Sequence, residues 1–124
     1  MKKIKNLKEL RIWMKSKDLV VEIYKLTATF PTSEKFGLTS QLRRAAISVM
    51  ANIAEGFYRQ TTKELISFLI NARGSAGEVI SHLIISTELD YIGKKKSSQL
   101  IERYEQLIVS ISSLIKSLRK KLKR

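Results

Sequence analysis

Residues 44–56 read RAAISVMANIAEG, and this stretch decides how the chain folds. Its apolar side chains recur at steps of three and four, which is the spacing of one face of a helix. Most of its side chains are small, and small side chains let two packed helix axes come closer than the usual separation of roughly 8 to 10 Å. The stretch therefore predicts a helix that packs unusually closely against a neighbour.

A second run of small residues, ARGSAG at residues 72–77, lies inside another helical pattern. A glycine inside a helix costs about 1 kcal/mol relative to alanine, so Gly74 and Gly77 need a compensating contact. Close approach of two helices would supply it. We expect the small residues of 45–51 to face those of 72–77.

Few helix breakers interrupt the chain, and they divide it into four segments. One proline and five glycines occur among 124 residues, and apolar positions recur at helical spacing nearly throughout. We expect the first helix to run from about Leu7 to Phe30, just before Pro31. The second should run from Thr39, as its N-cap, to a left-handed stop at Gly56.

The third segment begins with a capping box, because Thr61 and Glu64 have the required spacing. Its pattern continues to Ile92, with Gly93 as the stop, so it should be the longest helix.

After a loop at residues 93–98, the fourth helix carries a heptad stripe of apolar residues: Ile101, Tyr104, Ile108, Ile111, Ile115, Leu118 and Leu122.

Short connections between long helices favour antiparallel neighbours, so we predict an all-α fold, an antiparallel up-down-up-down four-helix bundle with residues 1–124 as a single domain. Leu42, Ala46, Val49 and Ile53 form the first apolar stripe of the second helix. The second and third helices each carry a further apolar stripe beyond the one that a core needs. A homo-oligomer would bury the surplus stripes, whereas a monomer would have to cover them with its own loops. They comprise Ile47, Met50, Ala54 and Phe57 on one helix and Ile66, Ile70, Gly77, Ile80 and Ile84 on the other.

The composition excludes several classes of protein. The chain has no cysteine, which excludes disulfides, thiolate metal sites and cysteine nucleophiles. Charges at Lys8, Glu9 and Arg11 interrupt the start of the chain, so we expect no signal peptide, and no later stretch is long enough without charges to span a bilayer. A cytoplasmic protein fits these features.

No constellation of residues points to catalysis. A glutamate beside an arginine could act as a general base, but no nucleophile, metal cluster or second carboxylate accompanies it. The lone His82 fits a surface or interface position, because single histidines seldom form a metal site. We therefore predict no enzyme activity, no cofactor and no metal. Four charged residues should instead pair across helices or across a subunit boundary: Arg44, Arg73, Glu55 and Glu78.

The chain is strongly basic. Lysine and arginine number 24 against 11 acidic residues, a formal net charge of +13, and such an excess attracts polyanions, above all nucleic acid. In an up-down-up-down bundle the two termini and the connection between the second and third helices share one end. The predicted nucleic-acid-binding residues gather there: Lys2, Lys3, Lys5, Lys8, Arg11, Arg59, Lys63, Lys116, Arg119, Lys120, Lys121, Lys123 and Arg124.

Few aromatic residues accompany this charge, so we expect binding that is driven by charge and weakly selective for sequence. Tyr58 beside Arg59 is the best candidate for stacking on a base, although a structural role is the simpler reading. The alternative for the charge as a whole is a solvated basic surface with no dedicated ligand. We read Lys94–Lys96 in that way, as part of a solvated loop.

Three segments of the chain resemble the 23S rRNA intervening-sequence proteins. They are LRIWMKSKDLVVEIYKLTATFP, FGLTSQLRRAAISVMANIAEGFYR and FLINARGSAGE, and the match is most specific at NIAEG and ARGS. In that family the reading frame often lies within an insertion in the large-subunit ribosomal RNA gene, and members form ring-like pentamers of four-helix subunits. They are also similar to accessory proteins of diversity-generating retroelements, which bind nucleic acid and a reverse transcriptase.

The resemblance implies a non-enzymatic, nucleic-acid-associated oligomer, with a homopentamer as the expected assembly. Where family members commonly have proline and serine, this chain has Met50 and Ala51, so a kink in the second helix should be absent or milder. The signature residues, some of which we expect at subunit interfaces, are Leu42, Arg43, Arg44, Ala45, Asn52, Ile53, Ala54, Glu55, Gly56, Ala72, Arg73, Gly74, Ser75 and Glu78.

Two hypotheses for function therefore stand side by side. The first is a basic homo-oligomer that binds RNA or DNA through one charged end. The alternative is a protein-interaction scaffold or accessory subunit without direct nucleic-acid binding. A third reading, binding to a membrane surface through the basic fourth helix, is weaker because the core needs the apolar stripe of that helix.

Overall fold

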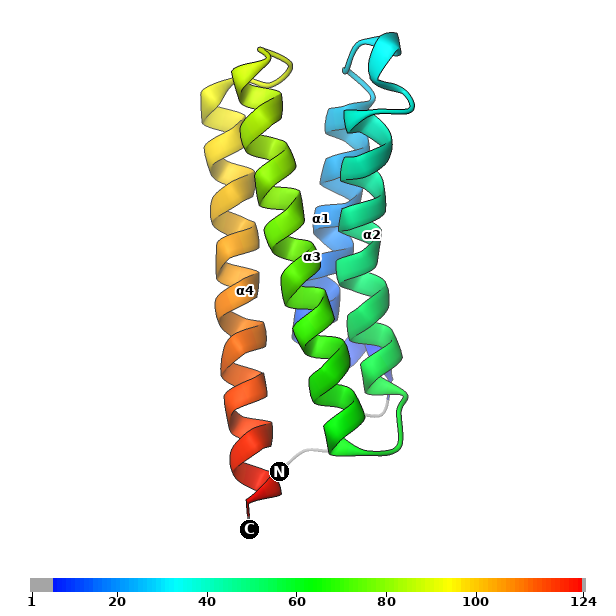
Figure 1. Cartoon of the computed structure of the whole chain (residues 1–124), viewed down its shortest axis with the longest axis vertical. Helices are drawn as coiled ribbons and strands as arrows, with labels where there is room; N and C mark the ends of the chain where they lie inside the picture. The colour runs from blue at the N-terminus through cyan, green and yellow to red at the C-terminus, as the bar shows by residue number, and fades with distance from the viewer. Residues whose placement is uncertain (1–5, 124) are drawn as a thin grey trace.

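Four long helices make up most of the chain that the structure describes, residues 6–123 of a computed structural model. Successive helices lie side by side and run in opposite directions (Figure 1). The predicted all-α, up-down-up-down four-helix bundle is therefore confirmed. In chain order the elements are η1 (Leu7–Glu9), α1 (Arg11–Thr27), η2 (Thr32–Glu34), α2 (Leu38–Phe57), α3 (Thr62–Glu88) and α4 (Lys94–Leu122), where η denotes a short 3-10 turn.

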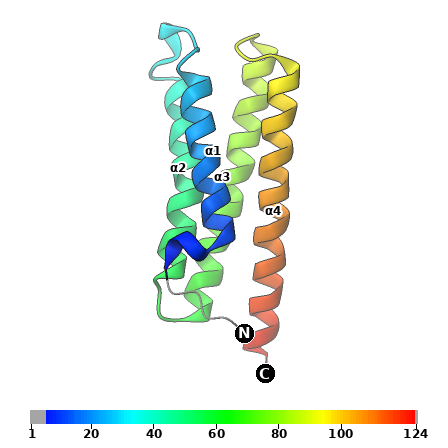
Figure 2. The ribbon, with the colours of Figure 1, turned by 180° about the vertical axis from the view of Figure 1, so that it is seen from behind.

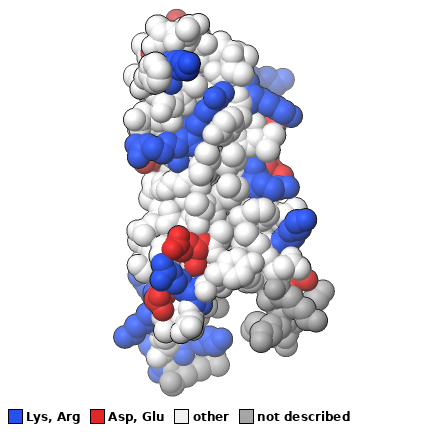
Figure 3. Space-filling view, turned by 90° about the vertical axis from the view of Figure 1, so that its right-hand side faces the viewer, with Lys and Arg blue, Asp and Glu red and all other residues white. Residues whose placement is uncertain are grey.

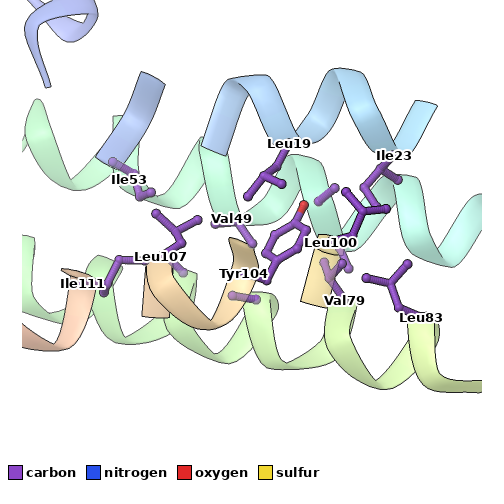
Figure 4. Close-up of a cluster of buried hydrophobic side chains, with 14 of the residues drawn as sticks. Leu19, Ile23, Val49, Ile53, Val79, Leu83, Leu100, Tyr104, Leu107 and Ile111 are labelled. Atoms are coloured by element: carbon purple, nitrogen blue, oxygen red, sulfur yellow. The ribbon is translucent and has the colours of Figure 1, made fainter. Parts of the chain in front are cut away.

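Apolar side chains from all four helices meet in one core, part of which Figure 4 shows. Tyr104 of α4 is fully buried there and points toward α1, and burial raises the pKa of its hydroxyl. The first apolar stripe predicted for the second helix is confirmed, because all four of its residues are buried. They are Leu42, Ala46, Val49 and Ile53.

The heptad stripe of α4 turns slightly away from its predicted direction. Ile101 and Ile108 are only half-buried, and Leu122 is 45% exposed. The reason is that α4 points the line between this stripe and the neighbouring leucines Leu100 and Leu107 at the core, so these leucines are buried together with part of the stripe. The buried set is Ser97, Leu100, Tyr104, Leu107, Ile111 and Ile115.

The first helix is shorter than predicted at both ends. Leu10 is extended, with φ −84° and ψ 109°, and separates the turn η1 from α1. At the other end α1 stops at Thr27, whose hydroxyl donates to the backbone oxygen of Ile23 at 2.7 Å. The same hydroxyl accepts a hydrogen bond from Arg43 Nε of α2 at 2.8 Å, so the end of α1 is bound to its neighbour.

A glutamate outside α2, and not Thr39, provides the cap of that helix. Glu34 Oε1 accepts the backbone N–H of Leu38 at 3.0 Å, and the N-cap position is Gly37. Glu34 Oε2 accepts the hydroxyl of Tyr91 at 2.9 Å, and this hydrogen bond raises the pKa of Tyr91. One carboxylate thus joins the two loops at the upper end of Figure 1.

Gly56 is needed for space and not for a left-handed stop. It lies inside α2, it is buried, and no described glycine has a positive φ. A Cβ at this position would lie 2.9 Å from Phe68 Cβ and 3.1 Å from Leu65 Cδ1, both on α3. The α2–α3 contact is the most extensive in the bundle, and Gly56 allows the two helices to approach each other there.

The predicted facing of small residues agrees with the burial of the other alanines, but it is wrong for Ala51, which is exposed, and for the two glycines. Residues Ala46, Ala72 and Ala76 are fully buried, and the hydroxyls of Ser48 and Ser75 lie 2.8 Å apart across α2 and α3. Gly74 and Gly77 are exposed instead, and a Cβ on either would meet nothing within 4 Å. These two glycines leave bare backbone on the outer face of α3. The helix α2 continues without a break from Leu38 to Phe57, and so also through Met50 and Ala51, where family members commonly have proline and serine.

The capping box of α3 is confirmed, but the helix ends earlier than predicted. The Thr61 hydroxyl accepts the backbone N–H of Glu64 at 3.2 Å. At the other end Asp90, with φ 62°, adopts the left-handed conformation, and Tyr91 N donates to Ser86 O at 2.9 Å. Aspartate takes this conformation more easily than most residues, so no glycine is required. With 27 residues α3 is shorter than α4, which has 29.

The three lysines Lys94–Lys96 form the first turn of α4 and not a loop. Lys96 Nζ lies 3.1 Å from Glu22 Oε1 of α1, and this hydrogen bond lowers the pKa of Glu22. The pair bridges α1 and α4, the neighbours that pack most loosely around the bundle.

Among the described residues, no helix is both long and apolar enough to cross a membrane.

Replacing Gly56 by alanine should destabilise the bundle. The added Cβ overpacks the α2–α3 contact at a cost of about 1 to 3 kcal/mol, which outweighs a gain of up to about 1 kcal/mol in helix propensity. We expect a lower free energy of unfolding in urea, followed by circular dichroism. Gly74→Ala is the matched control and should raise that free energy, because its Cβ enters open space. Equal stability of Gly56→Ala and the unmodified protein would contradict the proposed close contact.

Candidate nucleic-acid interface

The lower end of the bundle gathers three separate parts of the chain. The first described turn, the connection between α2 and α3 and the end of α4 all lie toward it (Figures 1 and 2). We call this surface the basic end; its described cations are Lys8, Arg11, Arg59, Lys63, Lys116, Arg119, Lys120, Lys121 and Lys123. The other predicted residues of this surface, Lys2, Lys3, Lys5 and Arg124, lie outside the described residues.

The cations near the end of α4 carry uncompensated charge. All five are exposed, and none forms an ion pair with a described acidic side chain. Figure 3 shows Lys and Arg atoms around the lowest part of the molecule and others spread farther up the same face. Cations in the last turn also favour the helix dipole, so part of this pattern stabilises α4 itself.

Arg59 differs from these residues because two carboxylates already surround it. Its guanidinium lies 2.8 Å from Glu55 Oε1 and 3.6 Å from Glu64 Oε2, and it also covers the ring of Phe68 at 4.9 Å. The prediction from the sequence did not distinguish Arg59 from the other cations of the basic end. The spacing of four residues between Glu55 and Arg59 was the signal that could have revealed the pairing.

A groove between α3 and α4 concentrates the positive charge. It has a volume of about 280 Å³, and its lining contains no acidic residue. Arg73 comes from α3, and its Nη1 donates to Ser112 Oγ of α4 at 3.2 Å. We call this hollow the α3–α4 groove; its lining is Arg73, Ser112, Ile115, Lys116, Arg119, Lys120 and Lys123. Sequence reasoning assigned Arg73 to an interface and missed this position, because only the pairing of the two helices brings it to the α4 cations.

The predicted cross-helix pairing of four charged residues is wrong within one chain. Arg44 donates to Gln41 at 2.7 Å, and Glu78 lies 3.3 Å from His82, in both cases on the same helix. The reason is that carboxylate and arginine side chains reach neighbours at i+3 or i+4 more easily than residues on the next helix. Of these four residues, only Arg73 forms a side-chain hydrogen bond to another of the described helices, and its partner is Ser112.

Two other signature residues have structural partners. Arg43 stacks on the ring of Tyr24 at 4.4 Å and so binds α2 to α1. Asn52 donates to the backbone oxygen of Ser48 at 2.8 Å. Both side chains are partly buried and engaged within the chain.

Among the described residues, no group of three or more His, Cys, Asp or Glu side chains could hold a metal ion.

Fold and charge together define a basic four-helix-bundle protein. The model of the 23S rRNA-intervening sequence protein family matches residues 8–113, so the chain belongs to that family. A solved structure of a protein of unknown function from the S23 ribosomal protein family of Bacteroides thetaiotaomicron is similar in fold. It shares 24% identity with a TM-score of 0.79, and the match covers 85% of this chain and 95% of that one. Comparison with curated proteins gives no match.

The different surroundings of two cations at the basic end predict different contributions to polyanion binding. Lys120→Gln should lower the salt concentration at which the protein elutes from heparin, because its charge is uncompensated. Arg59→Gln should lower it less, because two glutamates already offset that charge. Both side chains are exposed, so both variants should fold. A larger effect of Arg59→Gln would contradict the roles given to the ion pairs.

Proposed function

We propose that the protein is a non-enzymatic, basic homo-oligomer that binds RNA or DNA through its basic end, in the cytoplasm. The observation that carries this proposal is the set of five α4 cations that have no described acidic partner, four of which line one groove together with Arg73. A strand of nucleic acid would supply the missing negative charge. Each neutralised phosphate releases condensed counterions, which favours binding at low salt.

The composition of the basic end supports charge-driven binding over base readout. Lysine acts as a point charge toward phosphate, and four of the five α4 cations are lysines. Tyr58 is 67% exposed and packs edge-on against Phe57 with ring centroids 5.0 Å apart. It is therefore accessible for stacking on a base, as the sequence suggested, but it is a single aromatic residue beside many cations.

The outer faces of α2 and α3 support self-association. Ile84 and Ile85 are 51% and 44% exposed, and Ile47 and Ile70 are also exposed. Between the exposed isoleucines of α3 lie the bare backbones of Gly74 and Gly77, where another helix could approach closely. A ring of subunits, which the resemblance to ring-forming members favours, would place several basic ends on one rim and add avidity.

The same apolar surface favours a second candidate function. A protein-interaction scaffold would use the exposed isoleucines for a different protein, and its positive charge would serve solubility or docking. Such a partner would stay bound after nuclease treatment, whereas a complex bridged by nucleic acid would dissociate. A membrane-surface role finds less support, because α4 turns most of its large apolar residues into the core.

Removing the terminal charges should weaken binding to all nucleic-acid sequences alike. In a variant with Arg119, Lys120, Lys121 and Lys123 replaced by Gln, the slope of log affinity against log salt should fall by about 3, at 0.7 to 0.9 per cation. Fluorescence anisotropy with several labelled RNA and DNA strands measures this slope. Affinity of the unmodified protein that stays constant from low to moderate salt would rule out the proposed function.

Polar substitutions on the outer face of α3 should disrupt the oligomer. We expect the variant Ile84→Gln/Ile85→Gln to shift toward a single chain in sedimentation velocity, because it removes apolar surface that an interface would bury. Val21→Gln is the control, since Val21 is 46% exposed on α1. An unmodified protein that remains a single chain at high concentration would reject self-association, whatever the variants do.

A further inference from the structure

We propose that the α3–α4 groove seats the phosphodiester backbone of a nucleic-acid strand, with Arg73 and the α4 cations as its phosphate ligands. This inference rests on the proposed function and makes it specific. It replaces diffuse binding over the whole basic end with one hollow, and it gives Arg73 a binding role in place of the predicted interface role.

The geometry of Arg73 suits a phosphate ligand. The side chain is partly buried, and its hydrogen bond to Ser112 Oγ at 3.2 Å fixes the direction of the guanidinium. That bond uses one N–H of Nη1, and a guanidinium carries five N–H donors in a planar fork. The remaining donors can bind two oxygens of one phosphate, which is the arrangement that makes arginine a strong phosphate ligand.

The α4 cations extend the site beyond one phosphate. Lys116, Arg119, Lys120 and Lys123 follow steps of three, one and three, so they lie along one edge of α4 beside the groove. From Ser112 to Lys123 the helix rises about 16 Å, at 1.5 Å per residue. Successive phosphates of one strand are spaced about 3.4 Å apart along a B-form duplex, so this row can contact several of them.

The charge balance favours an anionic occupant. Cations three and four residues apart on a helix repel one another, and no described acidic side chain lines the groove to offset them. The one aliphatic lining residue is Ile115, which is fully buried in the core, so the groove presents no exposed aliphatic side chain to anchor a hydrophobic peptide or a lipid tail, and its apolar atoms belong to the stems of the cations. A repeating anion is the occupant that matches this lining.

Paired substitutions can separate the groove from the rest of the basic end. The groove variant is Lys116→Gln/Lys120→Gln, which changes two exposed side chains. The matched controls remove two charges elsewhere: Arg59→Gln/Lys63→Gln at the same end and Lys94→Gln/Lys95→Gln at the opposite end. Labelled single-stranded RNA, DNA of the same sequence, their duplex and polyglutamate serve as probes, and circular dichroism checks that each variant folds.

We expect the groove variant to lower nucleic-acid affinity about tenfold or more at moderate salt and to reduce the salt slope by about 1.4 to 1.8. Both control pairs should change affinity much less. RNA and DNA should lose similar amounts if the phosphodiester is the recognised group, and the ratio of their affinities shows which strand is preferred. Arg73→Lys should also weaken binding, because it keeps the charge and loses the fork.

Three results would overturn the inference, and they separate it from the proposed function. Equal losses in all three pairs would show diffuse binding, which rejects the groove and leaves the proposed function standing. Polyglutamate that binds as tightly as RNA and loses as much in the groove variant would show a general anion site without phosphodiester recognition. No binding of any nucleic acid by the unmodified protein, even at low salt, would reject both.

Discussion

The close contact between α2 and α3 is the constraint on which the rest of the bundle depends. Gly56 leaves no room for a Cβ beside Phe68, and the buried alanines and the Ser48–Ser75 hydrogen bond continue the contact along both helices. Because small residues occupy this contact, one row of larger side chains from each helix is buried in the common core, among them Val49 and Ile53 of α2 and Leu69 and Leu83 of α3. The helices α1 and α4 then cover that core from the two sides, α4 along α3 and α1 along α2.

The pairing of α3 with α4 also determines where the positive charge gathers. Antiparallel packing of α4 on α3 brings Arg73, from the middle of one helix, to the second half of the other, where it donates to Ser112. The family match ends at residue 113, so the cations of α4 from Lys116 onward lie beyond it, whereas Arg73 lies within it. Family membership therefore accounts for the bundle, and the α3–α4 groove combines a matched helix with a stretch that the match does not include.

Local sequence signals predicted some features correctly and misplaced others. The Thr61–Glu64 cap and the buried stripe of α2 depend on residues within one or two turns, so the pattern was sufficient. The end at Gly56 was misread, because a glycine can provide a left-handed turn or simply space, and only the neighbouring helix distinguishes the two. The end at Gly93 was misread because Asp90 takes the left-handed conformation after α3, whereas Gly93 is the extended N-cap of α4. The cap of α2 was missed for a similar reason: Glu34 lies in a 3-10 turn that no periodic pattern reveals.

The sequence by itself determined the number of helices, their order and the excess of positive charge, because periodicity and composition are local or additive properties. The tertiary structure decided which cations are free and which are offset, since Arg59 meets two glutamates and the α4 cations meet none that is described. It also turned Gly74 and Gly77 outward, away from the contact that the sequence assigned to them. The rotation of α3 about its own axis settles the direction of the two glycines, and that rotation depends on how all four helices share one core.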